Sequence, residues 1–415
     1  MKPVVVLFAH YGEEWIRGSE RCLLDLLAHL DRRRFTPVAW CNARTMEAEI
    51  AALDVPVHRS RFSIVADWGR PRWDVLNWLR LVREGKALAA RYGAQLLHAN
   101  SGAPVQWLVP VASARRLPLL AHLHSPYPLR SRCTLGLHQV SLAVGVSQAC
   151  IDGLLEDGVS PERVRVIPNG VDAARLEAQA EAGFRSRLGY GPEHLVIAQI
   201  GSLIRRKGVD VLLGAFQRLH RSHPRTRLIL AGDGPDRAQL EALRDQLGLG
   251  DAVRFLGDFR QPGKLLHDVA DIVVSASRHE PFGLTLIEAG VFARPVVATD
   301  TAGARDILRD GTNGLVVPAD DAGALAAALA RLLDDAALRT RLGEALRATV
   351  QARFTVERYT EAFAGVYSGL LERDGLAPGR RQMAMSVRVC GRWLGGVLRA
   401  RGAARAPSRA PRSSP

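Results

Sequence analysis

The sequence predicts an α/β protein built from two doubly wound, Rossmann-like domains that face a central cleft. Short β-branched runs alternate with longer amphipathic segments, which is the pattern of parallel strands joined by crossover helices. This series starts again near residue 194, after a polar, alanine-rich stretch at residues 173–191. A length of 415 residues suits two or three domains, each with a core of its own.

The first series predicts a domain of residues 1–183. A buried strand at residues 3–10 is followed by an amphipathic helix at residues 18–30. Further strands are expected at residues 37–41, 95–100, 117–124, 140–147 and 164–170. Because a helix or loop follows each of them, we expect a parallel sheet that is covered on both faces.

The second series predicts a domain of residues 184–354, with a helix at residues 208–223. Its strands are expected at residues 194–201, 226–234, 253–257, 271–277, 294–300 and 314–318. The chain has neither a Gly-x-Gly-x-x-Gly motif after its first strand nor a P-loop lysine motif, which disfavours a nicotinamide-dependent dehydrogenase and a P-loop kinase. In paired doubly wound domains, a ligand is expected between the carboxyl ends of the two sheets.

Charge and cysteine content exclude further classes. The net charge is +14, but residues 375–415 hold nine Arg and no acid, so the rest of the chain sums to 14 − 9 = +5. This nearly neutral body, without a zinc-finger or RNA-binding sheet motif, disfavours a nucleic-acid-binding protein. The five cysteines are scattered and form no Cys-x-x-Cys pair, so we expect neither a disulfide scaffold nor a zinc module. No apolar run reaches the roughly 18 residues of a membrane span, and we expect a cytoplasmic protein.

The segment DIVVSASRHEPFGLTLIEAG, residues 271–290, carries the clearest chemistry. A strand ends here, a loop carries Glu280 and Gly283, and a helix begins near Leu284. Unpaired N–H groups and the dipole at a helix start suit a phosphate, and carboxylates suit the diols of a sugar. We therefore expect Glu288 to bind a ribose, the helix start to bind a diphosphate, and Glu280 to bind a transferred sugar.

Five segments, in this order, resemble glycosyltransferase family four, the large retaining group with the GT-B fold. They are RGSERCLLDLLAHL, VSQACIDGLLEDGVSPERVRVIPNGVD, GSLIRRKGVDVLLGAF, LILAGDGPDRAQLEAL and HEPFGLTLIEA. The likeness covers roughly residues 1–370. It implies an acceptor-side first domain, a nucleotide-sugar donor domain, and a final helix at residues 355–374 that crosses back to the first domain.

The resemblance assigns roles in the donor site. Lys207 matches the lysine that neutralises the donor diphosphate. The family usually has an arginine where this chain has Ser202, and Arg206 or Arg205 would supply the second cation. The other implied donor-binding residues come from the first glycine loop and from the 271–290 segment: Gly18, Ser19, Glu280, Phe282, Gly283, Leu284, Thr285 and Glu288. Glu20 is interpreted as a charge at a helix N-terminus rather than as a catalytic group.

Histidines end two strands of the first domain. His124 matches the family's active-site histidine, and His122 lies on the same strand face and competes for this role. His98 and Asn100 end the preceding strand and are expected on the acceptor side. With Lys207 and Glu280, His124 completes the catalytic set that the resemblance implies.

The implied reaction moves a sugar from a nucleoside-diphosphate sugar to a glycan or lipid-linked acceptor, with retention at the anomeric carbon. The family's mechanism is front-face, and we expect neither a metal ion nor another cofactor. Another GT-B enzyme, such as a sugar-nucleotide epimerase or a phosphorylase, and a non-catalytic homologue are the alternatives. The resemblance also implies a role in the biosynthesis of a cell-surface polysaccharide or glycolipid.

Two basic segments suggest an anionic membrane surface as a partner. Residues 380–399 predict an amphipathic helix with apolar residues on one side and arginines opposite, followed by a low-complexity end of the basic tail at residues 375–415. Residues 58–132 hold twelve Lys and Arg against three acids, interleaved with Trp68, Trp73 and Trp78. We therefore expect peripheral attachment to the inner face of the cytoplasmic membrane.

Overall fold

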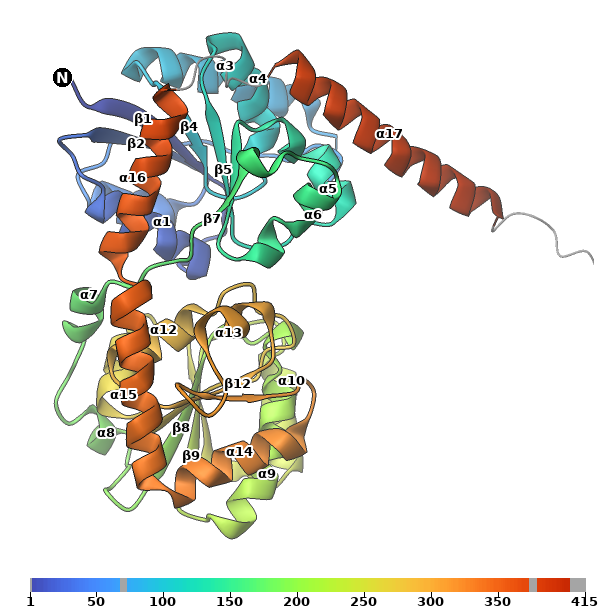
Figure 1. Cartoon of the computed structure of the whole chain (residues 1–415). Helices are drawn as coiled ribbons and strands as arrows, with labels where there is room; N and C mark the ends of the chain where they lie inside the picture. Colours follow the sequence, from blue (N-terminus) through green and yellow to red (C-terminus); the bar gives the residue numbers. More distant parts are fainter. Residues whose placement is uncertain (1, 68–72, 373–378, 404–415) are drawn as a thin grey trace, which may run out of the picture.

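The computed structural model describes residues 2–67, 73–372 and 379–403, and it contains two parallel sheets covered by helices on both faces (Figure 1). The predicted α/β architecture of two facing Rossmann-like domains is confirmed. Trp68 and the low-complexity end of the basic tail lie outside the described residues. Among the helices of the described part, none has the length and apolar character of a membrane span.

The first sheet has seven strands in the order β3-β2-β1-β4-β5-β6-β7. Its strands are β1 (Val4–His10), β2 (Phe35–Cys41), β3 (Val57–Arg59), β4 (Leu96–Ala99), β5 (Leu119–Leu123), β6 (Leu142–Gly145) and β7 (Val164–Val166). Because β1 pairs with β2 on one side and β4 on the other, the chain reverses its direction of winding at this point. The short edge strand β3 was not predicted, since three residues carry too little periodicity.

Helices cover both faces of this sheet. They are α1 (Gly18–His29), α2 (Arg44–Ala51), α3 (Val75–Tyr92), α4 (Val105–Arg115), α5 (Leu129–Thr134) and α6 (Asp152–Glu156), with the 3-10 turns η1 (Leu137–Gln139), η2 (Gln148–Cys150) and η3 (Pro161–Arg163). Leu23, Leu26 and Leu27 recur on one face of α1 and are fully buried against the sheet. This spacing of apolar residues is what makes the segment an amphipathic helix.

The second sheet has six strands in the order β10-β9-β8-β11-β12-β13, which repeats the same winding. Its strands are β8 (Leu195–Ile200), β9 (Thr226–Ala231), β10 (Val253–Gly257), β11 (Ile272–Ser275), β12 (Val296–Thr299) and β13 (Leu315–Val317). The surrounding helices are α7 (Ala173–Glu177), α8 (Phe184–Arg187), α9 (Val209–Ser222), α10 (Arg237–Gln246), α11 (Pro262–Asp268), α12 (Leu284–Val291), α13 (Ala302–Ile307), α14 (Ala322–Asp334) and α15 (Ala336–Arg353), with η4 (Arg205–Lys207) and η5 (Gly250–Ala252).

The chain passes between the domains twice, and the two passages are hydrogen-bonded to each other. The amide of Val171 donates to Phe354 O at 2.8 Å, and the amide of Val356 donates to Val171 O at 3.1 Å. Helix α7 contacts α11 and α12 of the second domain. The first domain therefore ends near Val171, somewhat before the boundary at residue 183 that the sequence suggested.

The C-terminal helix α16 (Val356–Glu372) returns to the first domain and packs on α1 (Figure 1). Its Tyr359, Phe363 and Tyr367 are buried in the same cluster as Val6 and Phe8 of β1. After it, α17 (Arg380–Ala403) contacts α5 and η1. The predicted amphipathic helix at residues 380–399 thus exists and is docked at one end on the first domain.

Candidate active site

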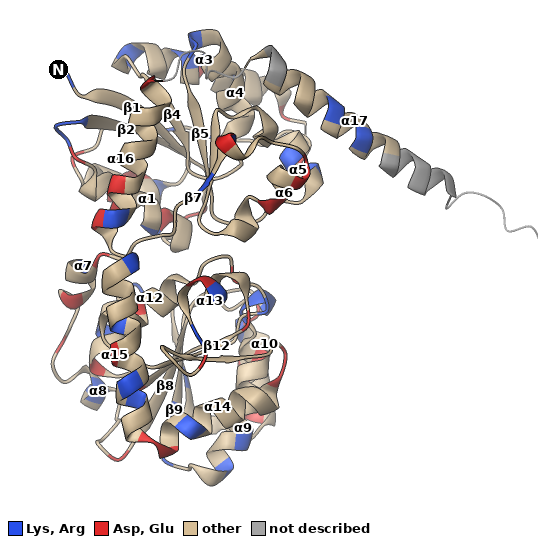
Figure 2. Ribbon diagram, in the orientation of Figure 1, with Lys and Arg blue, Asp and Glu red and all other residues tan. Residues whose placement is uncertain are grey.

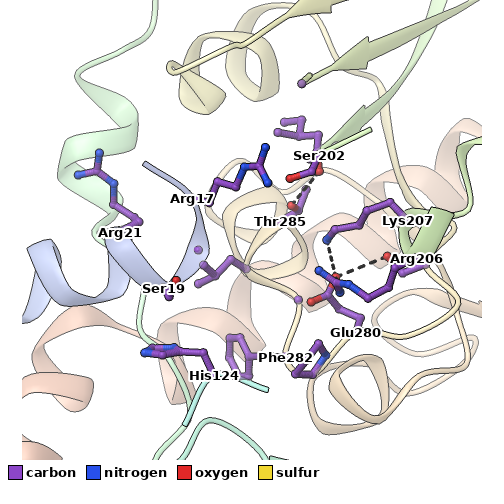
Figure 3. A pocket seen from close by; sticks show the side chains of 18 of the residues that line it. Arg17, Ser19, Arg21, His124, Ser202, Arg206, Lys207, Glu280, Phe282 and Thr285 are labelled. Atoms are coloured by element: carbon purple, nitrogen blue, oxygen red, sulfur yellow. Dashed lines mark hydrogen bonds and ion pairs between the residues drawn. The ribbon is translucent and has the colours of Figure 1, made fainter. Parts of the chain in front are cut away.

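A cavity of about 1910 Å³ lies between the domains, where the carboxyl ends of both sheets meet. The loops after β1, β5, β8, β9 and β11 line it, as expected for doubly wound sheets. Eleven of the residues assigned to the catalytic or donor-binding set from the sequence lie on its wall: Gly18, Ser19, His124, Arg206, Lys207, Glu280, Phe282, Gly283, Leu284, Thr285 and Glu288. Figure 3 shows His124 and Arg17 from the first domain on the wall of the cavity that also carries Lys207, Arg206 and Glu280.

Lys207 and Glu280 form an ion pair on the wall of the second domain. Lys207 Nζ donates to Glu280 Oε2 at 2.5 Å, and Arg206 Nη1 lies 3.7 Å from the same oxygen (Figure 3). The side chains of Lys207 and Glu280 are 18% and 13% exposed. Two cations thus lie close to one carboxylate at a surface that is partly shielded from solvent. An anionic ligand that enters the cavity would contact both of them.

Backbone geometry holds this pair in place. Gly208 follows Lys207 and begins α9 with φ of +61°, a left-handed conformation that favours glycine. A side chain at Gly208 would overlap the carbonyl oxygen of Ala276, which lies just before the loop that carries Glu280. The absence of a Cβ therefore lets the Lys207 segment and the Glu280 segment approach closely.

The start of α12 faces the same space. Gly283 precedes it with φ of +100°, and no side chain caps the helix. The hydroxyl of Thr285 donates to Ile200 O at 3.3 Å, which ties the first turn of α12 to the end of β8. An uncapped helix start carries unpaired N–H donors and a partial positive charge, so it suits a phosphate.

Glu288 lies about one turn further into α12 and is only partly exposed. Burial raises the pKa of its carboxyl group, the charge of Asp25 adds to this effect, and Arg175, Arg21 and Lys207 oppose it. A partly desolvated carboxylate among cations is a strong acceptor for hydroxyl groups. Arg21 and Arg175 also line the cavity, and neither lies in a motif that predicts such a position.

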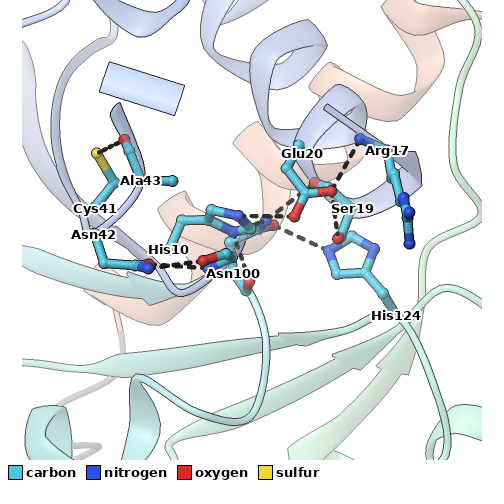
Figure 4. Close-up of polar contacts among 10 residues, drawn as sticks. His10, Arg17, Ser19, Glu20, Cys41, Asn42, Ala43, Asn100 and His124 are labelled. Atoms are coloured by element: carbon cyan, nitrogen blue, oxygen red, sulfur yellow. Dashed lines mark hydrogen bonds and ion pairs between the residues drawn. The ribbon is translucent and has the colours of Figure 1, made fainter. Parts of the chain in front are cut away.

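Opposite this wall, His124 is held by a chain of polar contacts (Figure 4). His124 Nε2 lies 3.0 Å from Asn100 Oδ1, and Asn100 Nδ2 donates to Ser19 O at 3.1 Å. Because this carbonyl oxygen can only accept, Asn100 Oδ1 is the acceptor toward His124. His124 Nε2 therefore carries a proton, which leaves Nδ1 as the basic nitrogen. Burial, together with the charge of His10, lowers the pKa of His124 to about 3, so the ring is neutral.

The contacts continue to Glu20 at the start of α1. His10 Nδ1 lies 3.0 Å from Asn100 Nδ2, and His10 Nε2 lies 3.1 Å from Glu20 Oε1. The amide of Arg17 and the hydroxyl of Ser19 donate to Glu20 Oε2 at 3.2 and 3.1 Å (Figure 4). Burial alone would raise the pKa of Glu20, but the contacts with His10, with the backbone and with Ser19 lower it to about 2.

His10 belongs to this arrangement but was not predicted as a site residue. Its signal was available, because His10 ends β1 just as Asn100 and His124 follow the ends of β4 and β5. Glu20 does lie in the first turn of α1, as predicted, and it additionally orients His10. Glu20 also lines the cavity itself, whereas His10 lies behind Asn100 and His124.

The structure does not place His98 on the acceptor side of the cavity, nor His122 where it could compete with His124. Both rings are fully buried under α16, and neither lines the cavity. His98 Nδ1 lies 2.7 Å from the Tyr367 hydroxyl, and the ring of His122 packs between His124 and Phe363. Asn100 is buried as well, so it positions His124 rather than facing an acceptor. The β4 and β5 side chains turn inward because α16 covers this face of the sheet.

Arg206 is the second cation near Glu280 on this wall of the cavity. It lines the cavity and donates to His279 O at 2.8 Å, which places it beside Glu280. Among the described residues that line the cavity, Arg205 is absent and Ser202 is present. Of the two arginines that the sequence left open as the second cation, Arg206 is therefore the one on the cavity wall.

Two facing Rossmann-like domains, with a lysine–glutamate pair and an uncapped helix start at the cleft, define a protein of the GT-B class. Two family models match this chain: Glycosyltransferase Family 4 over residues 16–175 and Glycosyl transferases group 1 over residues 184–349. Together they cover most of its length. The chain therefore belongs to the group 1 glycosyltransferases with a GT-B fold.

Relatives and solved structures agree with this assignment. The alpha-D-kanosaminyltransferase of Streptomyces kanamyceticus is 28% identical over 332 residues, which are 74% of this chain and 84% of the relative. The lipopolysaccharide core biosynthesis glycosyltransferase LpsE of Rhizobium meliloti is 34% identical over 200 residues, 48% of this chain and 56% of the relative. With several other relatives, too, the chain spans only about half of their length. The structure of Anabaena Alr3699/HepE in complex with UDP and glucose shares the fold, with a TM-score of 0.75, 24% identity, and coverage of 88% of this chain and 99% of that one.

Proposed function

We propose that this protein transfers a sugar from a nucleoside-diphosphate sugar to a glycan or lipid-linked acceptor, with retention, in the biosynthesis of a cell-surface polysaccharide or glycolipid. The observation that carries the proposal is the arrangement of Lys207, Arg206, Glu280 and the start of α12 around one cavity. Anabaena HepE, which shares the fold, was solved with UDP and with UDP-glucose, and this supports a nucleotide-sugar donor.

The donor diphosphate fits the positive end of this wall. Lys207 and Arg206 would neutralise the charge that develops on the departing diphosphate, and the N–H groups at the start of α12 would bind its oxygens. Glu288 would accept the hydroxyls of the ribose, and Glu280 would accept hydroxyls of the sugar. Because these groups supply the positive charge at the leaving group, we expect transfer without an added metal ion.

The acceptor would enter from the side of the first domain, where His124 faces the cavity. In a front-face reaction, the bond between the anomeric carbon and the diphosphate oxygen breaks, and the acceptor oxygen bonds to the same face of that carbon. The proton of the acceptor hydroxyl passes to the departing phosphate. His124, neutral and held by Asn100, would accept a hydrogen bond at Nδ1 and so orient the donor sugar.

A thermal-shift panel of UDP-, GDP- and ADP-sugars tests the donor site. One donor class should raise the melting temperature of the wild type, and Lys207→Ala and Glu288→Ala should lose this rise. Lys86→Ala on α3 and Glu344→Ala on α15, which lie outside the cavity, should retain it. If Lys207→Ala and Glu288→Ala keep the full rise, the donor site is assigned wrongly.

The stereochemistry of the product separates the proposed reaction from the alternatives. Proton NMR of the product at early times should show the anomeric configuration of the donor. An inverted product would refute retention. Conversion of the donor to an epimeric sugar, with no transfer to any acceptor, would instead favour a sugar-nucleotide epimerase, and binding without turnover would favour a non-catalytic homologue.

Peripheral attachment to the cytoplasmic face of a membrane is part of the proposal. On α17, the side chains of Met383, Val387 and Leu394 are exposed, Val387 to 68%, and Arg388 and Arg392 are exposed as well. Figure 2 marks the arginines of this helix in blue. Apolar residues also project before and at the start of α3: Trp73, Val75, Leu76 and Leu79. An exposed apolar strip next to arginines is the composition of a helix that binds an anionic membrane surface.

Co-sedimentation with vesicles of anionic or neutral lipid tests this attachment. The full chain should bind anionic vesicles at low salt, and Val387→Asp should weaken binding, because it places a negative charge in the exposed apolar strip. A chain that ends at Asp374 should bind least. If that shorter chain binds as well as the full chain, or if the full chain ignores anionic vesicles, α17 has no such role.

A further inference from the structure

A cluster of potential metal ligands lies where α17 contacts the first domain. Within the described part of the chain, it is the one group of His, Cys, Asp and Glu whose ligand atoms lie close enough to hold a metal ion. Cys133 comes from α5, His138 from η1 and Cys390 from α17, and their ligand atoms lie within 4.8 Å of one another. Both cysteines are free thiols and partly buried, and His138 is fully buried.

One ring nitrogen of His138 is held by a carboxylate, and the other has no partner among the described residues. Its Nε2 lies 2.7 Å from Asp157 Oδ2, and Arg132 holds the same carboxylate through Nε at 2.6 Å and Nη2 at 2.9 Å. Because a carboxylate accepts, Nε2 carries the proton and Nδ1 carries the free lone pair. Nδ1 is buried, and among the described residues it has no hydrogen-bond partner. A histidine that is held by a carboxylate through one nitrogen commonly binds a metal ion through the other.

We propose that Cys133, His138 and Cys390 bind one Zn²⁺ ion, which fastens α17 to the first domain. Two thiolates and an imidazole form a common zinc ligand set, and tetrahedral zinc places two thiolates about 3.8 Å apart. The observed spread of up to 4.8 Å therefore needs a contraction of only about 1 Å. Two thiolates balance the charge of the ion, and a water molecule would complete the tetrahedron on the exposed side.

The ion would decide how firmly α17 is held. Without it, the helix is attached mainly through buried Val389 and Ser386, and the contact from Gln139 Nε2 to Ser386 Oγ is long, at 3.5 Å. A bond from Cys390 to zinc adds a fixed point on α17 close to this contact. It would orient the exposed Val387 and Leu394 outward from the first domain. This inference concerns the attachment of α17 and does not depend on sugar transfer.

Metal content and a cobalt spectrum test the site directly. The reduced full chain, stripped with a chelator and dialysed against Zn²⁺, should bind one equivalent by elemental analysis. Co²⁺ in its place should give the charge-transfer absorption of thiolate ligands. Cys133→Ser and Cys390→Ser should lose both signals, and Cys150→Ser, a buried cysteine outside the cluster, should keep them. Asp157→Asn should weaken zinc binding by about 10–100-fold, because it loosens the hold on the His138 ring.

Limited proteolysis tests the consequence for α17. Trypsin should cut at exposed Arg388 and Arg392 more slowly with Zn²⁺ than after chelation, as followed by mass spectrometry. This difference should disappear in Cys390→Ser, whose two domains should melt as in the wild type. The proposal is overturned if the cysteine variants bind zinc as the wild type does, or if the reduced chain takes up none. It is likewise overturned if Cys133 and Cys390 form a disulfide that persists under reducing conditions and excludes the metal.

Discussion

Replacing Gly208 by alanine should both destabilise the second domain and disrupt the proposed donor site around Lys207 and Glu280. The added Cβ would lie much less than 3.0 Å from the carbonyl oxygen of Ala276, whereas real Cβ atoms essentially never come within 3.0 Å of another heavy atom. Both partners are main chain, so neither can swing away. Either the start of α9, which follows Lys207, or the segment before Glu280 must move by roughly 1 Å, a shift of the size that overpacked cores undergo.

The size of the effect follows from two costs. A left-handed conformation costs a residue with a Cβ about 1–2 kcal/mol, and forced displacement in a packed region costs about 1–3 kcal/mol more. The sum of roughly 2–5 kcal/mol should lower the melting temperature of a domain of this size by about 5–15 °C. A shift of about 1 Å would also separate Lys207 from Glu280, so donor affinity should fall at least about tenfold.

Unfolding is best followed by far-UV circular dichroism, which reports on the helices of both domains. Tryptophan fluorescence would miss the second domain, because all seven tryptophans lie outside residues 184–354. Gly214→Ala is the matched control. It lies in α9, the helix that follows Gly208, and its new Cβ would meet nothing closer than 3.8 Å. The control should be neutral or stabilising by up to about 1 kcal/mol. If Gly208→Ala has the same melting temperature as Gly214→Ala and the donor affinity of the wild type, Gly208 does not need to lack a side chain beside Ala276.

Three further perturbations test the first domain. Because Glu20 has a pKa of about 2 when folded, its contribution to stability is present above pH 4.5 and is lost as the pH falls toward 2. This contribution amounts to about 3 kcal/mol. The difference in free energy of unfolding between wild type and Glu20→Gln, measured by tryptophan fluorescence, should therefore become smaller as the pH falls from 4.5 toward 2. Tyr367→Phe removes the hydroxyl beside His98 and should cost about 1–3 kcal/mol in thermal or urea unfolding, since it leaves a buried polar nitrogen unpaired. His124→Ala should lower kcat while donor binding persists, and since the pKa of His124 is about 3, the wild-type pH–rate profile should show no inflection from this ring near pH 6.5.

Most of the fold, and the cavity wall that carries Lys207 and Glu280, were predictable from the sequence for a physical reason. Parallel strands that alternate with helices place all their carboxyl ends on one edge, so Lys207 after β8 and Glu280 after β11 had to lie close together. Local motifs on such loops therefore predict three-dimensional proximity. Eleven residues from four separate segments line one cavity because the topology brings these loops together.

Contacts that depend on packing were not predictable. His98 and His122 alternate with core residues on β4 and β5, and only the position of α16 decides that they are buried. The cluster of Cys133, His138 and Cys390 was invisible for a similar reason. Its third member lies more than 250 residues from the first two, on a helix whose docking site no local pattern encodes.

The paired passages at Val171 and Val356 restrict how the two domains can move. They are bonded to each other, and Gly170 packs so closely on Thr355 that a side chain there would overlap the Thr355 backbone. Both chain passages between the domains therefore lie at one point. The domains can rotate about this point, but they cannot slide past each other. Opening of the cavity would be a rotation about this point, with a displacement that grows with distance from it. The far rim of the cavity would gate the entry of a bulky acceptor, while the walls nearest Val171 would barely change their separation.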